Sequence, residues 1–146
     1  MGGVRIDAAS KILLQSPAAG ALSGVTVTLT SNETQALGDA VYVLSTGKAG
    51  IAKADAIATS SGIFLAAAAV SGSASNTYLI HGILKFSASQ SWTVGQLLYL
   101  SATGTTTNTI AISPPTTANS VTQILGVALA ADTIFFSPSL VQVEHT

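Results

Sequence analysis

The chain has 146 residues, of which nearly half are apolar and only 8% are charged, and its formal net charge is −1. An average soluble domain has roughly 25% charged residues. The surface must therefore consist mainly of small neutral side chains, which indicates extensive contact with other subunits. The basic residues are scattered, which excludes the basic footprint of a nucleic-acid-binding protein. The absence of cysteine excludes disulfides and thiolate chemistry.

The N-terminal segment, residues 1–21, differs from the rest because it begins MGG and has three charged residues. We expect it to form an extended arm. It has no long apolar core and no cleavage site, so it is not predicted to be a signal peptide. The apolar stretch at 63–70 is far shorter than the roughly 20 residues of a membrane helix, so no membrane partner is expected. The length and Met1 indicate a small complete protein made in the cytoplasm.

From residue 25 onward the sequence has the pattern of β-structure. Val25, Val27 and Leu29 alternate with threonines, and this period of two predicts a half-buried strand. An Ala-rich stretch, residues 53–58, predicts a short helical turn or an irregular crossing. Clusters of Gly, Ser, Thr and Asn favour turns, and the apolar runs between them predict further strands at 41–43, 62–65, 78–80 and 82–86.

Four short blocks occur twice in the same order, which indicates an internal repeat. The clearest pair is LGDAVYVLSTG (37–47) and VGQLLYLSATG (94–104), offset by 57 positions. The other pairs are VTVTLTSN with GILKFSAS, GIFLAA with GVALAA, and NTYLI with DTIFF. A unit of about four short strands buries too little alone, so two units are expected to share a core. We predict an all-β fold, a small β-barrel or sandwich of two similar four-strand halves, with one domain over 22–146 (repeats approximately 25–80 and 82–139).

Residues that carry enzymatic or metal chemistry are few and scattered. His81 lies in the apolar run YLIHGIL and is expected to be a core or interface histidine, while His145 lies one residue from the end of the chain. The carboxylates form no metal-ligand spacing, and Asp39 and Asp132 are expected to accept backbone hydrogen bonds in turns. Trp92 is expected to anchor the core or a subunit contact, because ligand-stacking sites usually combine several aromatic side chains. We predict no enzymatic activity, no metal and no cofactor.

Several stretches carry a resemblance to known proteins. WTVGQLLYLSATG (92–104) is followed by a Thr/Pro-rich stretch and then by ILGVALAADTIFFSPS (124–139). In the first half, residues 38–67 have the rhythm GDAVYV, GK, KADA. These patterns resemble the small β-modules of virion proteins of tailed bacteriophages, and they are closest to the capsid decoration (cement) proteins. The resemblance covers roughly 25–139, and the N-terminal arm matches nothing in it.

The resemblance implies a structural virion protein. Proteins of this kind are typically β-barrel or sandwich homotrimers that bind the major capsid protein and stabilise the shell. An extended arm suits strand addition to a neighbouring subunit, where main-chain hydrogen bonds supply the binding. The residues expected to contact a partner are Arg5, Ile6 and Lys11 in the arm, together with Trp92. The expected location is the outer capsid surface of the virion, after synthesis in the host cytoplasm.

Two other functions stay open at this point. A fibre, spike or tail component would use similar β-modules, although a fibre usually has a longer chain with an attachment domain. A carbohydrate-binding module or hydrolase would need a cluster of exposed aromatic side chains or a facing pair of carboxylates. Trp92 and three tyrosines give little support for such a site.

Overall fold

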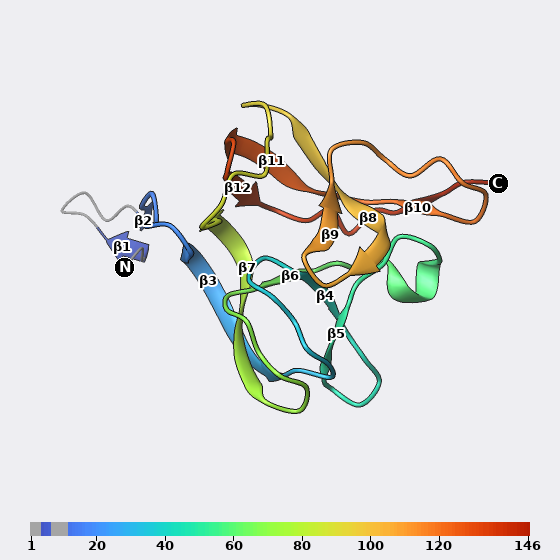
Figure 1. The fold of residues 1–146 in the computed structure, drawn as a ribbon, viewed down its shortest axis with the longest axis horizontal. Helices are drawn as coiled ribbons and strands as arrows, with labels where there is room; N and C mark the ends of the chain where they lie inside the picture. Colours follow the sequence, from blue (N-terminus) through green and yellow to red (C-terminus); the bar gives the residue numbers. More distant parts are fainter. Residues whose placement is uncertain (1–3, 7–11) are drawn as a thin grey trace.

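A computed structural model describes residues 4–6 and 12–146, and the regular structure in this part of the chain is β-strand with one short 3-10 turn, η1 (Ile57–Thr59) (Figure 1). The main sheet contains β3 (Ala21–Thr30), β4 (Ala40–Val43), β5 (Ala49–Ile51), β6 (Phe64–Ala66), β7 (Ser75–Lys85), β8 (Leu97–Thr105), β9 (Asn108–Ala111), β11 (Ile124–Ala130) and β12 (Thr133–Phe136). Two short antiparallel pairs lie outside it, namely β1 (Val4–Ile6) with β2 (Ile12–Leu14), and β10 (Val121–Thr122) with β13 (Val143–Glu144).

The main sheet is antiparallel and curls into a barrel-like shape. Its strand order is β5-β4-β6-β7-β12-β11-β8-β9, and β3 pairs with β7 outside this path. The two ends of the sheet come together, because the Ala40 N–H of β4 donates to the Thr109 hydroxyl of β9 at 2.8 Å. Nearby, the Ala54 N–H donates to the Ser101 carbonyl of β8 at 2.9 Å. The predicted all-β, barrel-like fold of two similar halves is confirmed.

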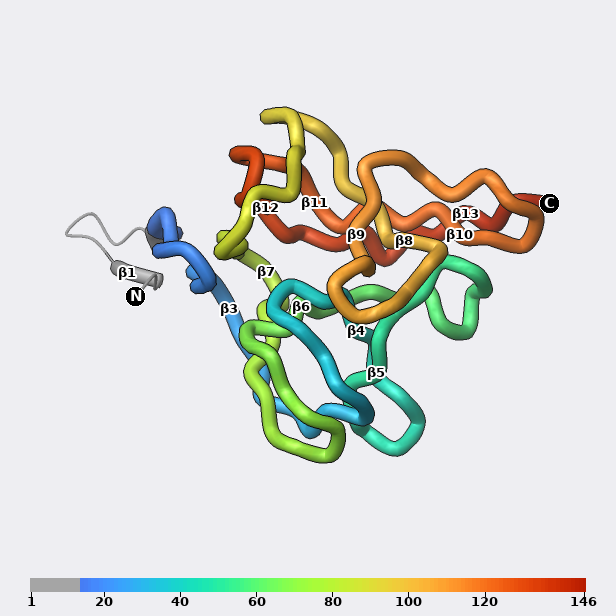
Figure 2. Tube along the Cα trace, viewed as in Figure 1, coloured from blue at the N-terminus to red at the C-terminus, as the bar shows by residue number. Residues whose placement is uncertain are grey.

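The two halves each supply four strands of the sheet and share β7 (Figure 2). In the first half, β3 pairs with the beginning of β7, with Val27 opposite Tyr78. In the second half, the end of β7 pairs with β12, with Leu84 opposite Ile134. The two pairs correspond, since 84 − 27 = 57 and 134 − 78 = 56. β7 is therefore the last strand of the first repeat and the first strand of the second.

The match of GIFLAA with GVALAA is wrong by two residues. That match aligns Gly62 with Gly126. In the sheet the equivalent of Gly126 is Phe64, because Phe64 pairs with Val41 of β4 and Gly126 pairs with Leu98 of β8. A shift of two residues keeps every side chain on the same face of a strand. Similar apolar runs can therefore be aligned at either position from sequence alone.

The centre of the β3–β7 ladder has no room for a side chain. Gly24 lies opposite Gly82, and the register shifts at the next pair, between Val25 and Thr26. A Cβ on Gly24 would overlap the His81 carbonyl, and a Cβ on Gly82 would overlap the Ser23 carbonyl. Gly82 also has φ +146°, which side chains rarely adopt. These two glycines let β3 follow the full length of β7 across the junction of the repeats.

The side chains of the barrel interior come from both halves. The main core includes Leu65 and Leu79 from the first half and Leu98, Ile134 and Phe136 from the second, all fully buried. A smaller core lies on the other face of the first half and contains Val41, Ala49, Ala66 and Tyr78. In the first half both faces of the sheet are therefore buried, whereas the second half buries one.

Candidate interaction surfaces

Asp39 is the buried carboxylate that joins the two halves. It is 1% exposed, and its Oδ2 accepts the Ala36 N–H at 2.8 Å while Oδ1 accepts the Thr107 N–H of the β8–β9 turn at 2.8 Å. Burial raises the pKa of this carboxyl, and the two backbone N–H donors oppose the rise. Both oxygens are occupied by backbone groups, as predicted for a turn residue. Asp39 therefore holds the β8–β9 turn against the loop before β4.

Gln35 and Tyr78 form a buried polar pair in the smaller core. The Tyr78 hydroxyl donates to Gln35 Oε1 at 2.7 Å, and Gln35 Nε2 donates to the Ala49 carbonyl at 2.8 Å. Burial also raises the pKa of the Tyr78 hydroxyl, which keeps it protonated and able to donate. Gln35 lies in the loop before β4, so these two hydrogen bonds fix that loop onto β7 and β5.

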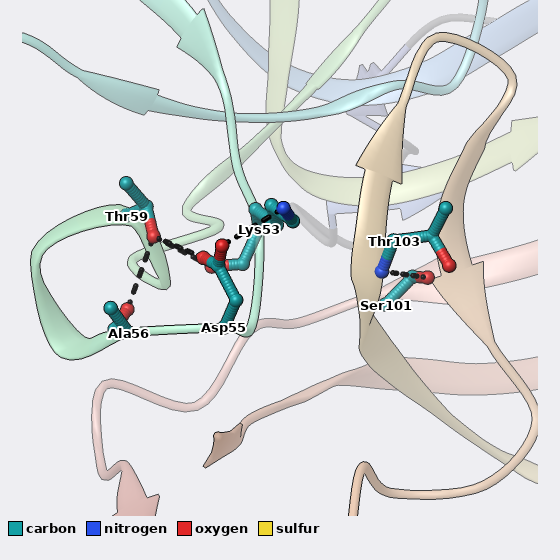
Figure 3. A network of polar contacts seen from close by, with 6 residues as sticks. All are labelled: Lys53, Asp55, Ala56, Thr59, Ser101 and Thr103. Atoms are coloured by element: carbon teal, nitrogen blue, oxygen red, sulfur yellow. Dashed lines mark hydrogen bonds and ion pairs between the residues drawn. The ribbon is translucent and has the colours of Figure 1, made fainter. Parts of the chain in front are cut away.

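A small polar network closes the turn after β5 (Figure 3). Lys53 Nζ lies 2.9 Å from Asp55 Oδ2, and the Thr59 hydroxyl donates to Asp55 Oδ1 at 2.9 Å. The hydrogen bond with Lys53 is the largest of the effects that lower the pKa of Asp55. The nearby Ser101 hydroxyl accepts the Thr103 N–H at 3.1 Å. Lys53, Asp55 and Thr59 are thus paired with one another and hold the turn that contains η1. The Ser101 hydrogen bond lies within β8.

Each of the two histidines contacts one neighbouring side chain of the fold. His81 is exposed and meets Phe135 edge to face, with ring centroids 5.2 Å apart. His145 Nε2 lies 3.0 Å from the Thr122 hydroxyl, between β13 and β10. Among the described residues, no group of three His, Asp or Glu side chains could hold a metal ion.

The outer face of the second half carries an apolar row that crosses four strands. The pairing places Leu97 of β8 opposite Val127 of β11, Val127 opposite Phe135 of β12, and Phe135 opposite Ile83 of β7. We call these four residues the outer row. Leu97 is 45% exposed, and the other three are half-buried. The row contains no charged side chain.

The apolar surface continues beyond the outer row. His81, packed on Phe135, pairs across the ladder with Val25 of β3, which is 55% exposed. His81 also borders a shallow cleft of about 360 Å³, lined by Phe64, Ile80 and Leu140 among others. Leu140 is 82% exposed. The outer row, His81 and this cleft together form the candidate interaction surface of the described chain.

The residues predicted to contact a partner lie in different parts of the fold. Trp92 is only 7% exposed and packs into the main core, edge to face with Phe86 at 5.3 Å. Of its two expected roles, the position fits that of a core anchor. Arg5 and Ile6 lie in β1, where Arg5 is opposite Leu13 of β2, and Lys11 lies outside the described residues.

Sequence reasoning missed the outer row. A signal was nevertheless present in QLLYL, ILGVALA and TIFF, which contain Leu97, Val127 and Phe135 and in which neighbouring positions are apolar without alternation. Antiparallel strands with one solvated face usually alternate, whereas continuous apolar runs are typical of strands buried on both faces. These runs therefore indicate that both faces of β8, β11 and β12 are suited to burial.

Comparisons of the chain with protein-family models, with curated proteins and with solved structures give no match. The described part of the chain contains no helix long and apolar enough to cross a membrane.

Proposed function

We propose that this chain is a capsid decoration protein of a tailed bacteriophage, which binds the outer surface of the major capsid shell as an oligomer, expected to be a homotrimer, and stabilises it. The motif resemblance in residues 38–67 and 92–139 is the starting point. The observation that carries the proposal is the uncharged apolar outer row on a chain with only 8% charged residues. Such a surface suits a protein that is covered by neighbours in an assembly.

We expect the shell to be stabilised by many copies of the chain, each of which makes a modest contact with the capsid subunits. Each copy adds an interface between capsid subunits. Because the copies bind the assembled shell, their binding favours the assembled state by mass action. Many copies on one lattice make the gain multivalent. Under this proposal the N-terminal segment contacts the shell, since β1 and β2 pair with each other and lie outside the main sheet.

Electron cryomicroscopy of virions that contain this chain tests the proposed location. We expect density for the barrel in regular copies over the capsid lattice. Density found only at a tail tip or a capsid vertex would instead assign the chain to a fibre, spike or tail component, the alternative with similar β-modules. Exposed loops such as residues 71–74 would then become the candidate host contacts.

A deletion of residues 1–14 tests the role of the N-terminal segment. We expect the deleted protein to keep its far-ultraviolet circular dichroism spectrum, because the main sheet begins at Ala21. We also expect it to stop co-sedimenting with expanded shells. Lys48→Ala removes a positive charge in the β4–β5 turn and serves as the control, with unchanged binding. An unchanged copy number on shells after the deletion would refute the arm contact.

A further inference from the structure

The internal repeat allows the exposed outer row to be compared with its counterpart in the same molecule. The equivalent of Leu97 is Ala40 and the equivalent of Val127 is Leu65, because Ala40 pairs with Leu65 as Leu97 pairs with Val127. The next pairs also correspond, with Leu65 opposite Leu79 in the first half and Val127 opposite Phe135 in the second. The row of the first half is thus Ala40, Leu65 and Leu79.

Three of the four equivalent pairs differ in environment, whereas in the fourth pair Thr26 is exposed and Ile83 is half-buried. Ala40, Leu65 and Leu79 are fully buried in the main core, where they meet apolar side chains of the second half such as Leu98 and Phe136. Their counterparts lie on the outer face, where Leu97 is 45% exposed and Val127 and Phe135 are half-buried. The second half thus carries on its outer face three residues, Leu97, Val127 and Phe135, whose counterparts in the first half are interior.

The composition of the outer row is that of an interior face. It contains Leu, Val, Phe and Ile. Leu97, Phe135 and Ile83 are larger than their counterparts in the first half, where Ile83 corresponds to Thr26. Val127 is one methylene smaller than its counterpart Leu65. Four strands about 4.8 Å apart make the row from Leu97 to Ile83 roughly 14 Å wide. Contiguous apolar surface of this kind on a soluble chain marks an interaction site.

One end of the outer row is already covered by this chain. The strand beyond Ile83 places Ser23 of β3 opposite it, and Ser23 is buried and accepts the Gln15 N–H at 3.0 Å. Within the described residues, the opposite end of the row at Leu97 stays 45% exposed. The described segment before β3 therefore protects the β3 end and leaves Leu97, Val127 and Phe135 for another molecule.

We propose that a second copy of this chain covers the outer row, so that Leu97, Val127 and Phe135 lie in the contact between subunits. The occupant is inferred from the molecule itself, because the equivalent row is buried by apolar strands of this same chain. The low charge of the chain supports the same conclusion, since copies meet without repulsion between like charges. This contact does not depend on binding to a capsid.

Sedimentation velocity on the purified full-length chain tests the contact in the absence of any shell. We expect the wild-type protein at tens of micromolar to sediment as an oligomer, with a mass at least twice the 14.6 kDa of one chain. Leu97→Glu places a charge at the exposed end of the row and is expected to give the 14.6 kDa monomer. Ile57→Glu, at a position 54% exposed in η1, is the matched control and should keep the wild-type mass.

A second variant keeps the test decisive if Leu97→Glu fails to fold. Val127→Thr changes the polarity of the row with almost no change in shape, and it is expected to raise the dissociation constant of the oligomer at least tenfold. Circular dichroism spectra of all variants should match the wild type. The proposal is overturned if the wild-type chain is monomeric at these concentrations. It is also overturned if folded row variants keep the wild-type dissociation constant. A monomeric wild type would also remove the oligomer from the proposed function, whereas binding to the shell would still be decided by the capsid assay.

Discussion

Gly38 and Gly95 occupy equivalent positions in the two halves, and both have φ +82°. The Gly38 N–H donates to the Ala66 carbonyl at 2.7 Å, and the Gly95 N–H donates to the Ala128 carbonyl at 2.8 Å. The same turn thus enters β4 and β8, and in each case it ties the start of the strand to its neighbour in the sheet. The left-handed backbone at both positions explains why the repeated phrase keeps its glycine.

The side chain after each glycine holds the turn by the same hydrogen bond. Asp39 Oδ2 accepts the Ala36 N–H at 2.8 Å, and Gln96 Oε1 accepts the Thr93 N–H at 3.2 Å. At these equivalent positions, a carboxylate oxygen and an amide oxygen therefore accept the same backbone hydrogen bond. The difference is that Asp39 is buried and also bonds to the other half, whereas the Gln96 turn lies at the surface.

Substitution of the two glycines by alanine should separate backbone strain from crowding. Gly95→Ala leaves the added Cβ in open space, so we expect only the strain of a left-handed residue, about 1–2 kcal/mol of unfolding free energy. At Gly38 the added Cβ overlaps the Phe86 ring, which should add about 1–3 kcal/mol. Urea unfolding of both variants measures the difference. Equal losses would contradict the crowding by Phe86.

Removal of the Tyr78 hydroxyl should destabilise the smaller core. Tyr78→Phe leaves Gln35 Oε1 buried without its 2.7 Å donor, and an unsatisfied buried acceptor costs about 1–3 kcal/mol. Tyr99→Phe, on the half-buried outer side of β8, is the control and should change stability by less than about 0.5 kcal/mol. Chemical denaturation at neutral pH gives both values. If the two variants lose the same free energy, the buried pair does not stabilise the fold as described.

The pH dependence of stability should contain opposite contributions from Asp39 and Asp55. The pKa of Asp39 is raised above its ordinary value of 3.8, so the folded state binds more protons than the unfolded state just above pH 3.8. Its contribution to the unfolding free energy therefore falls as the pH rises through this window. The pKa of Asp55 is lowered, so its contribution is present above pH 3.8 and is lost as the pH falls through the lowered value.

Thermal melts between pH 2.5 and about 7 on the wild type, Asp39→Asn and Asp55→Asn test these signs. The difference in stability between the wild type and Asp39→Asn should move against the wild type as the pH rises above 3.8. The difference from Asp55→Asn should move in favour of the wild type as the pH rises towards 3.8. A slope of the same sign for both variants would show that the environment of Asp39 is not as described.

The class of the fold and the location of its repeat could be predicted from the residues alone. The alternation at Val25, Val27 and Leu29 identified the strand that became β3, because a period of two is a local property of the chain. The matched glycines at positions 38 and 95 identified equivalent turns, since few residues other than glycine tolerate their backbone angle. The Asp39 turn was predicted on the same local grounds.

Which faces of the strands are buried could not be predicted in this way, because it depends on how the strands pack in three dimensions. In β6 and β7, Leu65 and Ala66, like Tyr78 and Leu79, are neighbours that point to opposite faces, and all four are fully buried. Their equivalents in the second half divide between the core and the outer row. A run of apolar residues does not reveal this division, because burial depends on which other strands pack above and below it. For the same reason, the place of Trp92 in the core and the exposure of Leu97 follow from how the two halves close against each other, not from the residues around them.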